Sequence, residues 1–147
     1  MGAPAGTEAA HPTLRTADEL RRLLAETQRR RWCVFATASW CVPCRRLHPA
    51  WEDVASPDNE FREFGFAVAD LSEESEQHLD GGSLSELLSI DTLPTFVLLD
   101  GSGREVARAV GAAHKRPARR LVGMLREALR SEAPHDHARG TSSRRPI

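Results

Sequence analysis

The chain has 147 residues, and its 20 basic and 21 acidic side chains give a formal net charge of -1, which excludes a strong binder of nucleic acid or another polyanion. It contains no apolar run near the roughly 20 residues that a membrane-spanning helix needs. Its three cysteines are too few, and an odd number, for the disulfide scaffold of a small secreted protein.

A chain of this length predicts a single domain, which we place at residues 14–131 between two disordered ends. Residues 1–13 are rich in Ala, Gly and Pro, and they have neither the basic start nor the apolar stretch of a secretory signal. Residues 132–147 are polar, and the two histidines there, His135 and His137, would make only a weak metal site on a solvated tail. We therefore expect a cytoplasmic protein.

Helix and strand patterns alternate along the domain. In chain order they predict a helix at 16–30, a strand at 32–38, a helix at 41–55, a strand at 65–71, a helix at 83–89, strands at 95–99 and 104–110, and a last helix that begins near Pro117. Thr16 and Glu19 have the spacing of a capping box that opens the first helix, and Pro49 is expected to kink the second. This order predicts an α/β protein in three layers, with a central mixed β-sheet between two layers of helices.

The segment Trp40-Cys41-Val42-Pro43-Cys44-Arg45 holds two cysteines where a strand gives way to a helix. Cys41 would lie at the helix N-terminus, where free N–H groups and the positive end of the helix dipole favour a thiolate. Cys44 follows one turn later, close enough to form a disulfide with Cys41, and Pro43 stiffens the ring between them. Such a thiolate can attack a substrate disulfide, after which the second sulfur resolves the mixed disulfide.

Two other interpretations of this cysteine pair stay open. A binding or scaffold module could keep the pair with little turnover, and an insulin-reduction assay would distinguish it. A metal-binding module is the weaker alternative, because zinc needs four ligands, or three and a water, and His48 is the only further candidate nearby. Cys33, on the preceding strand, is expected to be a buried small hydrophobe.

Four motifs resemble the thioredoxin family, and the resemblance covers roughly Leu14 to Arg130. They are the Trp-Cys-x-x-Cys-Arg turn at 40–45, Pro49 at the kink of the following helix, Thr92-Leu93-Pro94-Thr95 as the cis-proline loop, and the hairpin at 100–106 with Gly111. The resemblance implies a thioredoxin fold and a dithiol–disulfide oxidoreductase, most simply a reductase of protein disulfides. The run from Leu93 to Glu105 is similar to the thioredoxin-like domain of bacterial thiol:disulfide interchange reductases.

The resemblance also implies which residues act. Cys41 would be the attacking nucleophile and Cys44 the resolving thiol. The residues that would receive the substrate are Trp40, Pro43, Leu93 and Pro94. The redox-active disulfide Cys41–Cys44 would need no bound cofactor or metal, and its electrons would come from a flavin-dependent reductase or another dithiol protein. We expect a monomer that acts on protein disulfides and binds neither nucleic acid nor membrane.

One position departs from the family pattern. Thioredoxins carry a buried aspartate six residues before the first active-site cysteine, and this chain has Phe35 there. The family's buried lysine partner on the second strand is also missing, since residues 67–69 are Ala, Val and Ala. Proton transfer around Cys44 therefore has to differ from the family's arrangement. Asp70, at the end of that strand, either compensates or is a surface acid.

Overall fold

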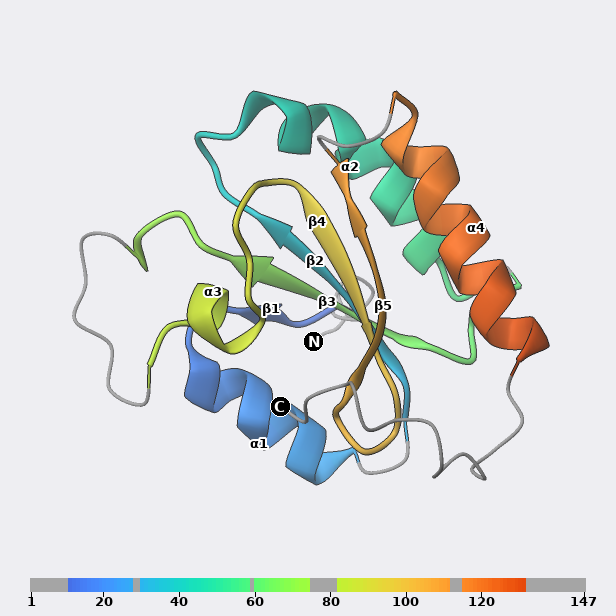
Figure 1. The fold of residues 1–147 in the computed structure, drawn as a ribbon, viewed down its shortest axis with the longest axis horizontal. Helices are drawn as coiled ribbons and strands as arrows, with labels where there is room; N and C mark the ends of the chain where they lie inside the picture. The colour runs from blue at the N-terminus through green and yellow to red at the C-terminus, as the bar shows by residue number, and fades with distance from the viewer. Residues whose placement is uncertain (1–10, 28–29, 59, 75–81, 112–114, 132–147) are drawn as a thin grey trace, which may run out of the picture.

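The structure is a computed structural model, and it describes residues 11–27, 30–58, 60–74, 82–111 and 115–131. Its elements in chain order are β1 (Thr13–Leu14), α1 (Ala17–Glu26), β2 (Trp32–Thr37), α2 (Val42–Ala55), β3 (Gly65–Asp70), α3 (Leu84–Leu87), β4 (Thr95–Leu99), β5 (Glu105–Val110) and α4 (Pro117–Arg130). Helices and strands alternate until a β-hairpin and a final helix close the chain (Figure 1). The predicted α/β class is confirmed.

Five strands form one mixed sheet in the order β1-β3-β2-β4-β5. β3 runs parallel to both β1 and β2, whereas β4 runs antiparallel to β2 and to β5. Every residue of the central strand β2 is buried, as its continuous apolar sequence predicts. Because Ala36 near the end of β2 pairs with Thr95 at the start of β4, the connection that follows β2 lies beside the loop that precedes β4.

Helices cover both faces of the sheet, so the molecule has the three layers predicted from the sequence. Figure 1 shows α2 and α4 on one face, with α1 and α3 on the other. Successive side chains of a strand point to opposite faces, and Phe35 packs in the core cluster beneath α2 and α4 while Val34 packs in the opposite cluster. Each face of the sheet therefore has its own hydrophobic core.

The first helix is shorter than the predicted 16–30. The predicted capping box between Thr16 and Glu19 is present at its start. At its other end, the backbone N–H and the hydroxyl of Thr27 both donate to the Leu23 carbonyl, and Thr27 leaves the helical conformation. The same hydroxyl accepts a hydrogen bond from the Trp32 indole at 2.9 Å, so a tertiary contact holds the position where the helix ends. The other predicted elements lie within two residues of their expected bounds.

The prediction that residues 1–13 form a disordered segment is wrong for Thr13. Thr13 and Leu14 form β1 at the edge of the sheet, in register with Val68 and Ala69 of β3, and the Val68 N–H donates to the Pro12 carbonyl at 2.9 Å. A strand of two residues has no hydrophobic period that a sequence pattern could reveal. Residues 1–10 and the tail with His135 and His137 lie outside the described residues.

Candidate active site

The two cysteines of the Cys-x-x-Cys segment lie at the start of α2 and form a disulfide, with Cα atoms 5.3 Å apart. Cys41 is the N-cap residue of α2, and its Sγ accepts a hydrogen bond from the Cys44 backbone N–H at 3.2 Å. Pro43 lies in the first turn, where a residue without an N–H leaves no helical hydrogen bond unmade. The structure thus contains the disulfide that the Cys-x-x-Cys spacing predicts, and it shows the pair in its oxidised form.

The two sulfurs differ in their access to solvent. Cys41 is 6% exposed and Cys44 is fully buried, and both belong to the core cluster under α2 and α4. An incoming reactant therefore meets Cys41 first. This difference in exposure suits a pair in which Cys41 attacks the substrate disulfide and the buried Cys44 then resolves the mixed disulfide.

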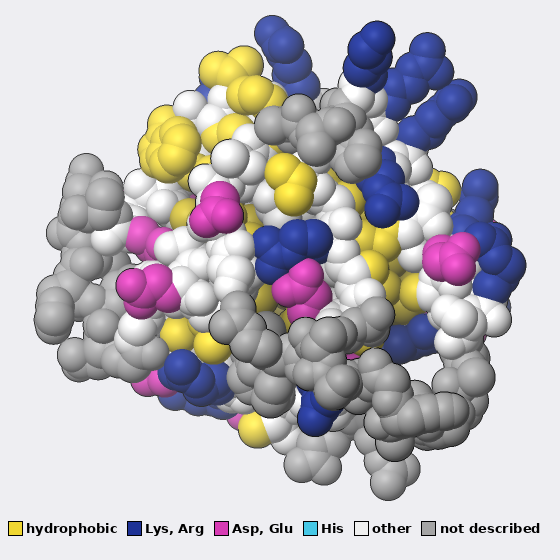
Figure 2. All heavy atoms as spheres, viewed as in Figure 1, with side chains coloured by type: hydrophobic (Ala, Val, Ile, Leu, Met, Phe, Trp, Pro, Cys, Tyr) yellow, Lys and Arg dark blue, Asp and Glu magenta, His cyan; other side chains and the backbone are white. Residues whose placement is uncertain are grey.

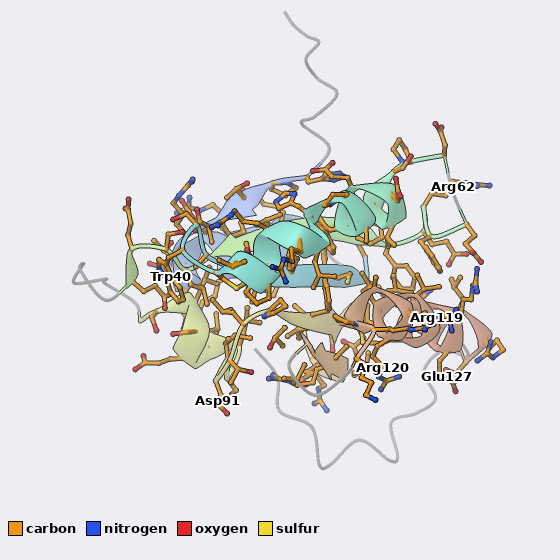
Figure 3. All side chains as sticks on the ribbon, turned by 90° about the horizontal axis from the view of Figure 1, so that it is seen from above. Trp40, Arg62, Asp91, Arg119, Arg120 and Glu127 are labelled. Atoms are coloured by element: carbon orange, nitrogen blue, oxygen red, sulfur yellow. A yellow bond between two sulfur atoms is a disulfide. The ribbon has the colours of Figure 1, made fainter. Side chains whose placement is uncertain are left out.

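An apolar surface surrounds the entrance to the pair. Among the described residues, the exposed large hydrophobic side chains are Trp40, at 65%, and Val42, at 45%. The Trp40 indole donates to the Ser72 carbonyl at 3.2 Å, which ties the ring to the loop after β3. Figure 2 shows hydrophobic side chains gathered over this part of the molecule, and Figure 3 places Trp40 at the opposite end of the molecule from Arg62.

The loop before β4 brings Pro94 to the same edge of the sheet. The Leu93–Pro94 peptide bond is cis, as the resemblance implied, with Pro94 buried and Leu93 half-buried. The Gly111 N–H donates to the Pro94 carbonyl at 2.8 Å. A Cβ at Gly111 would lie 2.6 Å from Pro94 Cγ, so only glycine permits this approach. The sequence indicated Gly111 only as the end of the hairpin, and its support of the Pro94 loop was missed.

Aromatic side chains belong to the same core cluster as the cysteine pair. Phe35 is fully buried, and its ring centroid lies 5.0 Å from that of Phe96, 5.1 Å from that of Trp51 and 5.8 Å from that of His48. Val68, the β3 residue that pairs with Phe35, is also apolar. Phe35, at the position of the family's buried acid, and Val68, its neighbour on β3, are therefore both apolar side chains in or against the core.

A pocket of about 970 Å³ lies beside these rings, between α2 and the β1–β3 edge of the sheet. His48 contributes to its wall, with Nδ1 3.6 Å from Oε2 of Glu52. Asp70 also lines the pocket, where it accepts hydrogen bonds from the backbone N–H and hydroxyl of Ser72 and lies 3.5 Å from the Arg15 guanidinium. These partners support the interpretation of Asp70 as an acid at the end of a strand.

The third cysteine has a different environment. Cys33 is fully buried and free, as predicted, and burial raises the pKa of its thiol well above the ordinary value. The thiolate is the reactive form of cysteine, so Cys33 is inert at neutral pH. Trp32 and Trp51 are buried in the core, as the sequence indicated.

Two further findings concern the ranges that the structure describes. No helix in them combines the length and the apolar character that crossing a membrane requires. His, Cys, Asp and Glu side chains in the same ranges do not gather in groups of three or more that could hold a metal ion.

Known proteins share this sequence pattern and this fold. Residues 13–126 match the model of the thioredoxin family. The chain is similar to thioredoxin H2-2 of Oryza sativa subsp. japonica, with 38% identity over 76 residues, which is 52% of this chain and 48% of that protein. It is also similar to thioredoxin H2-1 of the same plant, with 32% identity over 97 residues, or 66% of this chain and 62% of that protein. The chain thus spans about half to three-fifths of the length of these relatives.

Solved structures give the same result. The structure of Fasciola hepatica thioredoxin is 31% identical, with a TM-score of 0.57, and the match covers 77% of this chain and 97% of that one. Thioredoxin F from spinach chloroplast, in its short form, is 22% identical with a TM-score of 0.63, covering 88% and 99% of the two chains. The predicted fold is confirmed. Both thioredoxin H relatives come from a plant, so they do not support the similarity to bacterial interchange reductases.

Proposed function

The chain belongs to the thioredoxin family, and from this premise we propose that it is a thiol–disulfide oxidoreductase that reduces protein disulfides. The observation that carries the proposal is the Cys41–Cys44 disulfide at the N-terminus of α2, in which Cys41 keeps slight exposure and Cys44 is fully buried. The two sulfurs hold the electron pair themselves, so the reaction requires no bound cofactor.

The reaction begins on the reduced pair. The Cys44 N–H that donates to Cys41 Sγ and the positive end of the α2 dipole favour the Cys41 thiolate. This thiolate attacks one sulfur of a substrate disulfide. A bond forms between Cys41 and that sulfur, and the other substrate sulfur leaves with the electron pair of the broken bond.

Cys44 completes the reaction. It loses its proton and attacks Cys41 Sγ, which breaks the bond between Cys41 and the substrate and releases the second substrate sulfur as a thiolate. Two electrons pass from the protein to the substrate, and the protein is left with the Cys41–Cys44 disulfide that the structure contains. A donor dithiol then reduces this disulfide by the same exchange in reverse.

We assign substrate binding to the apolar surface around Cys41. It is formed by the exposed Trp40, Val42 and Pro43 and the half-buried Leu93, and we include the buried Pro94, which follows Leu93 in the same loop. The exposure of Trp40 and Val42 supports this assignment, because neighbouring exposed hydrophobic side chains mark surfaces that bind other molecules. The β2–β4 register supports it further, since it brings the Pro94 loop to the edge where α2 begins.

Reduction of insulin disulfides, with dithiothreitol as electron donor, tests the proposal. Cys41→Ser should lower turnover to the rate of dithiothreitol alone, and Cys44→Ser should stop after one attack, as a mixed disulfide on Cys41. Cys33→Ser is the matched control and should keep the parent's activity, because Cys33 lies outside the pair. Undiminished turnover in Cys41→Ser would contradict the proposal.

The direction of the reaction and the partners have tests of their own. Equilibration with a glutathione redox series should give a reduction potential near the roughly -270 mV of reductases, and a value near the roughly -120 mV of strong oxidants would reverse the assignment. A monomer, a cytoplasmic location, and a flavin-dependent reductase or another dithiol protein as donor complete the proposal. Light scattering, cell fractionation and reduction by a candidate donor would test these three points in turn.

A further inference from the structure

Cys44 has to lose its proton in an apolar environment. Its side chain is fully buried, and its core cluster contains Phe35, Trp51 and Phe96. Such surroundings disfavour a thiolate, yet the second step of the proposed reaction needs one. A base within hydrogen-bond reach, directly or through one water, would remove this difficulty.

We infer that His48, oriented by Glu52, accepts the proton that Cys44 loses when it resolves the mixed disulfide. The inference rests on the proposed function and names a residue that acts within it. Cys44, His48 and Glu52 occupy successive turns on one face of α2. Helical residues four positions apart have Cβ atoms about 5–6 Å apart, and helical side chains lean toward the N-terminus. The His48 side chain therefore covers the turn that contains Cys44.

The contacts of the His48 ring place it at the boundary between core and solvent. On one side it meets the Phe35 ring edge-on, with centroids 5.8 Å apart, and Phe35 belongs to the same core cluster as Cys44. On the other side the ring is open, since 46% of the His48 side chain is exposed and the ring lines the pocket beside β3. A proton taken from the buried thiol can thus be passed on to water.

Glu52 orients the imidazole for this task. Its Oε2 lies 3.6 Å from Nδ1 of His48, one turn further along α2. A carboxylate beside Nδ1 favours the tautomer with the proton on that nitrogen, which leaves Nε2 free to accept another. Histidine is the side chain that most often accepts a proton in general base catalysis.

The other charged or titratable side chains around the same pocket are His11, Arg15, Arg45 and Asp70. Asp70 is engaged by Arg15 and Ser72, and Arg45 donates to the Ser39 carbonyl at 2.8 Å. Arginine stays protonated and cannot accept a proton. His11 is therefore the rival imidazole, and it comes to the pocket from the segment before β1, whereas His48 lies on α2, the helix that carries Cys44.

Atoms and electrons are conserved in the resolving step when His48 accepts the proton. The Cys44 proton moves to Nε2 of His48 as Cys44 Sγ bonds to Cys41 Sγ. The electron pair of the broken bond leaves with the substrate sulfur, which takes a proton from the imidazolium or from solvent. The pair is oxidised from dithiol to disulfide, and the substrate disulfide is reduced to two thiols.

Glutathione disulfide serves as the probe for the test. The reduced protein is mixed with it, quenched with acid after increasing times, and the mixed disulfide on Cys41 is quantified by mass spectrometry between about pH 5 and pH 9. This measurement separates the formation of the mixed disulfide from its resolution. His48→Gln should leave formation unchanged and slow resolution by about 10²-fold near neutral pH, so that the mixed disulfide accumulates. Its resolution rate should rise only at the higher pH at which the thiol itself ionises.

Two further variants control the experiment. Glu52→Gln should slow resolution less than His48→Gln does, because the imidazole stays in place and loses only the carboxylate that orients it. His11→Gln, which removes the other imidazole from the same pocket, should match the parent protein. Circular dichroism would confirm that each variant is folded.

The results separate the inference from the proposed function. A parent protein that forms no mixed disulfide would overturn the proposed function. A parent that reacts normally, with His48→Gln showing the parent's resolution rate and pH profile, would overturn the role of His48 alone. Slow resolution in His11→Gln instead would assign the proton to the other histidine and equally overturn the inference.

Discussion

The two faces of the sheet are built from different side chains, although the same strands supply both. All five phenylalanines, Trp51 and the three cysteines pack in the core cluster under α2 and α4. The cluster under α1 and α3 is aliphatic, with Trp32 as its single aromatic residue. Aromatic side chains bury a large area in a defined geometry. The redox pair therefore lies on the face whose core is rich in aromatic side chains, and the core of the opposite face is mainly aliphatic.

The largest expected effect comes from truncating one buried residue on each face. Phe35→Ala should lower the free energy of unfolding by about 3–5 kcal/mol, and Leu88→Ala by about 2–5 kcal/mol, since both side chains are almost fully buried. Only Phe35→Ala should also change the resolution of the mixed disulfide, because Phe35 belongs to the same core cluster as Cys44 and its ring meets the ring of His48 edge-on. Chemical denaturation and the acid-quench assay would measure the two effects.

Equal effects of Phe35→Ala and Leu88→Ala on resolution would remove the functional difference between the faces. Phe35→Asp sharpens the test, because it adds the cost of burying a carboxyl group to the loss of the ring. Its free energy of unfolding should fall further than that of Phe35→Ala. A variant with the parent's stability would show that the ring does not support the pair.

The next largest effect on stability is expected at the contact between Gly111 and Pro94. Gly111→Ala would bring a Cβ to 2.6 Å from Pro94 Cγ and 3.0 Å from the Pro94 carbonyl oxygen. Overpacking of this kind costs about 1–3 kcal/mol, and displacement of the Pro94 loop should lower insulin reduction as well. A Gly111→Ala variant that is destabilised but keeps the parent's turnover would show that the Pro94 loop does not contribute to substrate binding.

Cys33 provides a pH-dependent comparison within the same face. Burial raises the pKa of its thiol, so the folded protein holds this proton more tightly than the unfolded chain does. The stabilisation is complete below the unfolded thiol pKa of about 8.5 and decreases above it, by at most about 1.4 kcal/mol for each pH unit. In the oxidised protein Cys41 and Cys44 do not titrate. The free energy of unfolding of Cys33→Ala should therefore lack this additional decrease at alkaline pH.

Free energies of unfolding of the oxidised parent and of Cys33→Ala, measured from about pH 7 to about pH 10, would check this difference. The two curves should run parallel below the thiol range and converge or cross above it. Curves that stay parallel throughout would mean that the Cys33 thiol ionises equally in the folded and unfolded states.

The smallest effect is expected at Gly123, in the interior of α4. A Cβ there would meet nothing within 4 Å, in contrast to Gly111. Gly123→Ala should therefore raise the free energy of unfolding by about 0.5–1 kcal/mol through the helix propensity of alanine. Thermal denaturation would measure it, and a loss of stability would show that α4 packs more tightly at this position than the structure indicates.

Local patterns in the sequence were sufficient for most of the elements and for the redox pair. The capping box, the apolar runs and the hairpin turn all act over a few neighbouring residues, so their consequences are present in the sequence itself. The Cys-x-x-Cys segment belongs to the same class, because Cys41 and Cys44 meet within one helical turn. The burial of Cys33 followed equally from its place in an apolar strand.

The tertiary structure decided everything that depends on residues distant in the sequence. β1 exists only because the edge of β3 offers backbone hydrogen bonds to Thr13 and Leu14. The approach of Gly111 to Pro94 depends on β4–β5 pairing, and the contact between Phe35 and His48 depends on how α2 crosses β2. A hydrophobic pattern specifies which side of a strand or helix is buried, but not which partner it meets there. That choice is made by strand register and helix packing, which are properties of the whole chain.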